Sequence, residues 1–81
     1  MPRYFFNTDD GHAFSDEEGT ELADLTATRL AAIQLTGQIL KDEKEAFWRT
    51  GEWHLHVSDE SGSVLFRLDV AASEGIGRSD A

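Results

Sequence analysis

The sequence predicts an α+β domain in which a four-stranded antiparallel sheet carries one long helix on one face. Two short segments, residues 3–15 and 53–70, gather strand-forming residues around turn signals. Between them, residues 24–47 carry apolar side chains at helical spacing. We therefore predict the order β-β-α-β-β, with two hairpins in a single domain over residues 1–70. A flexible tail is expected over residues 71–81 because that stretch is small and polar.

The first hairpin is predicted from an aromatic run at residues 4–6, which favours a partly buried strand over residues 3–8. Asp10-Gly11 follows, and Asp-Gly is a strong hairpin signal because glycine accepts positive φ. A returning strand over residues 12–15 would direct Phe14 inward. Residues 16–19, Asp-Glu-Glu-Gly, are then expected to form a second turn before the helix.

The helix is expected to begin at Asp24, because an N-cap carboxylate accepts hydrogen bonds from the free N–H groups of the first turn. Two neighbouring apolar stripes follow along it. The first consists of Leu30, Ile33, Gly37 and Leu40, and the second of Leu25, Thr28, Ala32, Leu35 and Ile39. This arc is wider than a helix on one sheet usually needs.

The length of the helix raises a related question. Its residues span about 35 Å, whereas a short strand of six or seven residues spans about 20 to 23 Å. We therefore expect the helix to overhang the sheet, to bend near Gly37, or to pack on another surface. Gly51 is the expected stop signal.

The second hairpin alternates clearly between apolar and polar residues. Trp53, Leu55 and Val57 are expected on one face of its first strand, and residues 59–62 have turn chemistry. The returning strand spans residues 63–70, with one face formed by Val64, Phe66, Leu68 and Val70.

Charge and composition exclude several classes of function. The chain of 81 residues has a net charge of −9, from 16 acidic and 7 basic residues, and contains no cysteine. A phosphate backbone and an anionic membrane would both be repelled, so neither nucleic acid nor membrane is an expected partner. Disulfides and thiolate metal sites are excluded, and no apolar run reaches the roughly 18 to 20 residues of a membrane span. A cytoplasmic protein is expected.

His54 and His56 share one face of a predicted strand, which can present two imidazoles to one metal ion. Zinc needs further ligands, and no third ligand stands at a telling spacing, although His12 could approach in space. We therefore predict exposed strand histidines and no metal or cofactor, and keep a metal site on His54 and His56 as an alternative.

The remaining polar motifs are predicted to be structural. The acidic run over residues 9–24 lacks the ligand spacing of a calcium loop, and its charges suit turns and a helix start. Residues 59–63 lack the adjacent base of a nucleophilic serine. No nucleophile–base pair is visible, so we do not expect an enzyme. Phe47, Trp48 and Trp53 are expected to close the core near Gly51.

Several of these segments resemble one known family. The opening residues 2–6, the Asp10-Gly11 turn, residues 16–22 and Asp24-Leu25 carry the resemblance, and the turn at residues 59–62 adds to it. The chain is similar, over about residues 2–70, to a family of small uncharacterised alphaproteobacterial proteins known only as a domain of unknown function. The resemblance implies a stand-alone α+β domain in a bacterial cytoplasm, with no site residues to carry over. Asn7 stands where typical members have His or Asp.

Three functions follow as hypotheses. The wide apolar arc favours a non-enzymatic interaction module that self-associates as a dimer through Ala32, Leu35 and Ile39. The acidic surface favours, as an alternative, a regulatory adaptor or antitoxin-like protein that covers a basic partner. The third is the small metal-binding protein that uses His54 and His56.

Overall fold

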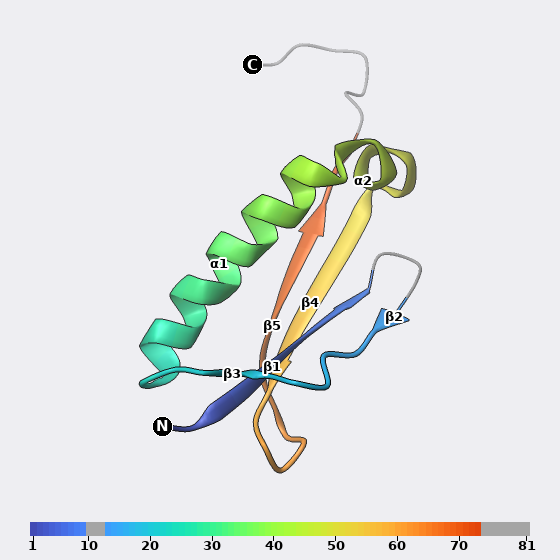
Figure 1. Cartoon of the computed structure of the whole chain (residues 1–81). Helices are drawn as coiled ribbons and strands as arrows, with labels where there is room; N and C mark the ends of the chain where they lie inside the picture. Colours follow the sequence, from blue (N-terminus) through green and yellow to red (C-terminus); the bar gives the residue numbers. More distant parts are fainter. Residues whose placement is uncertain (10–12, 74–81) are drawn as a thin grey trace.

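The computed structural model describes residues 1–9 and 13–73 and confirms the α+β class. One antiparallel sheet lies beside a helix that runs along its face, and a second, shorter helix turns across the end of the sheet (Figure 1). The elements in chain order are β1 (Arg3–Asp9), β2 (Ala13–Phe14), β3 (Thr20–Glu21), α1 (Leu25–Asp42), α2 (Lys44–Thr50), β4 (Glu52–Ser58) and β5 (Val64–Ala71).

The sheet has the strand order β2-β1-β4-β5, and β3 also pairs with β1. β2 pairs with the end of β1, at Thr8 and Asp9, whereas β3 pairs with its beginning, at Arg3 and Tyr4. β2 lies within the returning strand predicted over residues 12–15, whereas β3 is a further strand that was not predicted from the sequence. The predicted Asp10-Gly11 turn and the inward side chain of Phe14 lie outside the described part of the chain.

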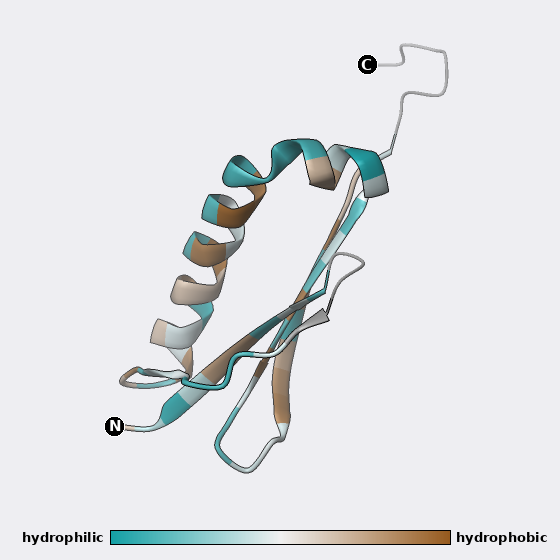
Figure 2. Cartoon of the chain, turned by 45° about the vertical axis from the view of Figure 1, so that its right-hand side comes forward, coloured by the Kyte–Doolittle hydropathy of each residue, from teal (hydrophilic) through white to brown (hydrophobic). Residues whose placement is uncertain are grey.

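The core lies between α1 and the two central strands. The alternation of β1 and β4 directs five large side chains towards α1, where they are buried together with Ala32: Tyr4, Phe6, Trp53, Leu55 and Val57. The other face of the sheet carries no helix within the described residues (Figure 2). Because no described helix covers this second face, polar side chains can occupy it.

The long helix predicted from the sequence is two helices, which is the main correction to the predicted fold. α1 continues unbroken through Gly37 and stops at Glu43, whose φ of −116° and ψ of 38° are not helical. Residues 41–45 are all charged, so no apolar side chain there holds a helix against the sheet. α1 has 18 residues and spans about 27 Å, close to the roughly 26 Å of the eight-residue β5, so the helix breaks where the sheet ends.

Both predicted helix ends are confirmed. The carboxylate of Asp24 caps α1 by accepting a 2.9 Å hydrogen bond from the N–H of Ala27. Gly51 ends α2 in the left-handed conformation, with φ of 76°, and its N–H donates to the carbonyl of Phe47 at 2.7 Å. Phe47 packs against the core, so the cap also positions an apolar anchor.

The apolar stripe of α1 that was expected to bind a partner is the one that packs on the sheet. Ala32 is fully buried and both Leu35 and Ile39 pack against the core, so the face expected to bind a partner lies on the sheet. Leu30 and Ile33 of the first stripe are 57% and 61% exposed, whereas Leu40 of the same stripe packs against the core. The reason is steric: Thr28, Ala32 and Thr36 recur every four residues on the buried line, and such small side chains let the helix approach the sheet closely.

A shift in register changes the predicted faces of β5. Val57 pairs with Phe66, whereas the next residue, Ser58, pairs with Val64, so Leu65 is an extra residue. Val64 therefore leaves the face that Phe66 occupies, and it lines a hollow on the open side of the sheet. The prediction that Val64 shares a face with Phe66 was wrong, because a bulge inverts the alternation.

Candidate functional site

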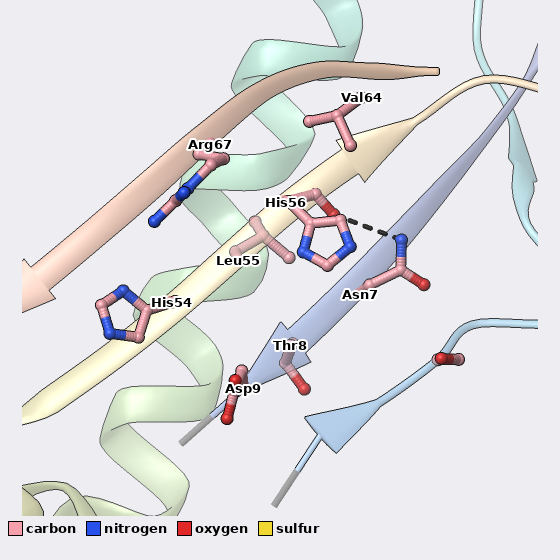
Figure 3. Close-up of a pocket in the computed structure, with 9 residues that line it drawn as sticks. Asn7, Thr8, Asp9, His54, Leu55, His56, Val64 and Arg67 are labelled. Atoms are coloured by element: carbon pink, nitrogen blue, oxygen red, sulfur yellow. Dashed lines mark hydrogen bonds between the residues drawn. The ribbon is translucent and has the colours of Figure 1, made fainter. Parts of the chain in front are cut away.

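The open face of the sheet carries the polar side chains that could bind a ligand. A shallow hollow of about 370 Å³ lies there, between β1, β4 and β5 (Figure 3). Asn7 and Asp9 of β1 and His54 and His56 of β4 line it from alternate positions, because successive strand residues point to opposite faces. Ser15 lines it from the segment after β2. The residues that line it include Asn7, Asp9, Ser15, His54, His56, Val64 and Arg67.

His54 is held by carboxylates on both sides of its ring. Its Nδ1 lies 2.7 Å from Asp69 Oδ1, and its Nε2 lies 3.1 Å from Glu52 Oε1. The hydrogen bond to Asp69, and then that to Glu52, raises the pKa of His54 above its ordinary value of 6.5. The same hydrogen bond with His54, followed by one from Arg67, lowers the pKa of Asp69.

The two strand histidines do not converge on one point. His54 is engaged with β5 through Asp69, whereas the ring of His56 lies beside Asn7 of β1 (Figure 3). No group of three or more His, Asp or Glu side chains that could hold a metal is present in residues 1–9 and 13–73. His12, the third histidine considered from the sequence, lies outside these ranges. The arrangement of His54 is that of a charged network rather than of a metal ligand.

Asn7 and Asp16 attach the segment between β2 and β3 to β1. The N–H of Asp16 donates to Asn7 Oδ1 at 2.9 Å, and Asp16 Oδ2 accepts from the N–H of Phe6 at 3.1 Å. Oδ1 of Asp16 accepts from Glu18 and Gly19. Partial burial raises the pKa of Asp16, but hydrogen bonds from the N–H groups of Gly19, Phe6 and Glu18 together lower it.

Much of the acidic run therefore stabilises the fold instead of forming a free charged surface. Asp16 holds its turn, Asp24 caps α1, and Glu21 pairs with Arg3 at 3.2 Å. Glu17 and Glu18 are exposed. The surface that could face a basic partner is smaller than the sequence indicates.

The second candidate site is apolar. Leu30 and Ile33 stand on the solvent side of α1, and Trp48 of α2 is 63% exposed while its ring makes an edge contact with Phe47 at 5.5 Å. The prediction that Trp48 closes the core was thus wrong, whereas Trp53 is buried. Leu30 and Ile33 share one face of α1, and large apolar side chains on one helix face favour a protein partner. Trp48 belongs to the other helix and lies outside this site.

Sequence reasoning missed Leu30 and Ile33 as surface residues and gave no role to Arg67 and Asp69. One signal for the helix was available, namely the small residues at positions 28, 32 and 36, which favour close packing on the sheet. No such signal pointed to the ion pairs of Asp69, because only the pairing of β4 with β5 brings His54 opposite Asp69.

The chain was compared with protein families, curated proteins and solved structures. The model of a family described as a domain of unknown function, DUF6894, matches residues 3–71. No curated protein and no solved structure matches the chain at significant similarity. Within the described residues, no helix is long and apolar enough to cross a membrane.

Proposed function

The chain belongs to this family of unknown function, and we propose that it is a non-enzymatic interaction module that self-associates as a dimer through α1. The observation that supports this function is the exposure of Leu30 and Ile33, at 57% and 61%, on the helix face turned away from the sheet. Side chains at i and i+3 are neighbours on a helix, so the two form one continuous apolar surface. Burying this surface in a second copy would remove it from water.

Gly37 lies beside this surface and has no side chain that would cover it. A Cβ atom built at Gly37 would meet no described atom within 4 Å, so the helix backbone is open there. An exposed glycine beside two large apolar residues allows another backbone or side chain to approach closely. The apolar surface and the open position together fit a partner helix better than a small ligand.

We propose a cytoplasmic setting in an alphaproteobacterium for this module. The sequence has no cysteine and so places no demand on an oxidising compartment. The resemblance of the opening segment and the acidic turn to small alphaproteobacterial proteins supports the source. Secretion of the native protein, or its recovery from the periplasm, would contradict the setting.

An acidic adaptor that covers a basic protein is the second candidate. It is supported by the net charge of −9 and by the exposure of Glu17 and Glu18 beside the turn at Gly19. Such a contact should weaken steeply with salt, because exposed charges are screened. Co-purification that is unchanged at high salt would contradict it.

The test of self-association uses charges placed on α1. Leu30→Glu and Ile33→Glu should each turn the dimer into a monomer in sedimentation equilibrium, while the circular dichroism spectrum stays that of the wild type. Trp48→Glu is the matched control, since it places the same charge on the exposed apolar residue of α2. Leu35→Glu should instead unfold the chain, because Leu35 packs against the core. A wild-type monomer at every concentration contradicts the proposed function.

A further inference from the structure

β5 is an edge strand of the sheet. In the strand order β2-β1-β4-β5, it pairs only with β4 among the described residues, and it is eight residues long. An edge of this length presents a row of backbone donors and acceptors on which another strand can pair. β5 is therefore a second place at which a copy of the chain could dock.

α1 leaves part of the sheet uncovered on the side of β5. The five large buried strand residues all belong to β1 and β4, whereas Phe66, Leu68 and Val70 of β5 pack against the core and stay partly exposed. A second copy placed beside β5 would bring its own helix onto the same face of the joined sheet. The partly exposed side chains of β5 would then be covered.

The charges of β5 select one way of pairing two copies. Arg67 and Asp69 lie two residues apart on the open face, at 61% and 52% side-chain exposure, and form a 3.0 Å ion pair within one chain. In an antiparallel pair with its two-fold axis at Leu68, Arg67 of each copy lies opposite Asp69 of the other, and opposed charges on one face attract. Moving the axis to Arg67 or to Asp69 would set like charges against each other.

The other registers are less favourable for two reasons. A register shifted by one residue would set residues of opposite faces against each other. It would also place the two helices on opposite sides of the joined sheet. An axis nearer the start of β5 would meet the register shift beside Val64, where regular pairing stops. Leu68 lies in the regular part of the strand, so its axis avoids both problems.

We infer that two copies of the chain join edge to edge through β5, antiparallel about Leu68, with Arg67 of each copy facing Asp69 of the other. This inference rests on the proposed self-association, but it places a contact between copies on β5. Leu30 and Ile33 face away from the sheet in each copy and lie outside this contact. The two sheets become one continuous sheet, and both α1 helices lie on the same face. The interface is isologous, as is usual for a two-fold dimer.

The first test reverses the charges. Arg67→Asp and Asp69→Arg alone should each raise the dissociation constant of the dimer by about tenfold, because each sets like charges opposite each other twice. An equimolar mixture of these two variants should recover the dimer, and so should the double variant R67D/D69R. Sedimentation equilibrium measures all four samples, and urea unfolding checks that each chain folds.

The second test uses the absence of cysteine from the chain. Leu68→Cys should form a disulfide between copies on mild oxidation, since opposed Cα atoms in an antiparallel pair lie roughly 4.5 to 5.5 Å apart. Leu65→Cys is the control, because its two copies would lie about 20 Å apart in this register. Equal cross-linking of both variants would overturn the register.

The outcomes separate the two proposals. A dimer that dissociates with Leu30→Glu but is indifferent to Arg67→Asp, with no disulfide at position 68, would overturn the edge pairing and leave self-association intact. A wild-type monomer would overturn both. Recovery of the dimer in the mixed variants, with cross-linking at position 68 and not at 65, supports the edge pairing.

Discussion

The backbone N–H of Asp16 donates a 2.9 Å hydrogen bond to the side-chain oxygen of Asn7, across nine positions of the chain. Asp16 in turn accepts from the N–H of Phe6, which neighbours Asn7 on β1. The amide group of Asn7 continues towards β4, where it donates to the carbonyl of His56 at 3.4 Å. One asparagine thus ties the acidic turn to the centre of the sheet.

The first prediction concerns Asp16. Asp16→Ala should lower the free energy of unfolding at pH 7 by about 2 kcal/mol, because backbone donors lose a charged acceptor. Since the pKa of Asp16 is lowered in the folded state, its contribution is present above the ordinary value of 3.8 and disappears as the pH falls through the lowered value. Urea unfolding at several pH values measures this. Glu17→Ala, at an exposed neighbour, should change stability by less than about 0.5 kcal/mol.

The second prediction separates strain from crowding at two glycines. Gly19 has φ of 74°, and a Cβ there would lie 2.7 Å from Cγ of Arg3 and 2.9 Å from Cε2 of Phe5. Gly62 has φ of 90° but open space around it. Both Gly→Ala variants should lose about 1 kcal/mol to the left-handed conformation, and Gly19→Ala should lose more. Equal losses in thermal unfolding would contradict the close packing of the acidic turn on β1.

The third prediction compares two buried threonines of α1. The hydroxyl of Thr28 donates to the carbonyl of Asp24 at 2.8 Å, whereas that of Thr36 has no partner among the described residues. Thr36→Val should raise the free energy of unfolding by about 1 kcal/mol, because an unsatisfied buried hydroxyl is removed. Thr28→Val should lower it, since a hydrogen bond is lost. Chemical unfolding of both variants provides the comparison, and a loss of stability in both would contradict it.

The fourth prediction concerns pH. Because the pKa of His54 is raised on folding, its network stabilises the fold fully below pH 6.5, and this contribution disappears as the pH rises through the raised value. The wild type should therefore lose stability as the pH rises from 6.5 to the raised pKa. Asp69→Asn should reduce this loss and move the NMR titration of His54 back towards its ordinary value.

Asp59→Asn is the control for this variant, because Asp59 accepts hydrogen bonds within its own turn, from Ser61 and Ser63, and lies outside the network of His54. A titration of His54 that is equally displaced in the wild type and in Asp69→Asn would contradict the assigned cause.

The sequence predicted the elements whose signals are local. The cap at Asp24, the stop at Gly51 and the second hairpin follow from neighbouring residues and are confirmed. β3 was missed because Thr20 and Glu21 become a strand only through their pairing with β1, which is remote in sequence. The break at Glu43 was likewise not predicted, because it depends on where the sheet ends.

The sites were harder to predict than the elements. The pattern of α1 indicated two apolar stripes but not which one meets the sheet, because that choice depends on the distance between helix and sheet and on the small residues Thr28, Ala32 and Thr36. The bulge beside Val64 was also invisible, since alternation alone does not show where register shifts.

Self-association can be measured directly as the molar mass of the wild-type chain by light scattering, at two protein and two salt concentrations. We expect a mass that rises with protein concentration to twice the 9.0 kDa of one chain and does not fall when salt is added, because the apolar contact of Leu30 and Ile33 is not screened. A mass of one chain under all four conditions would contradict self-association through α1.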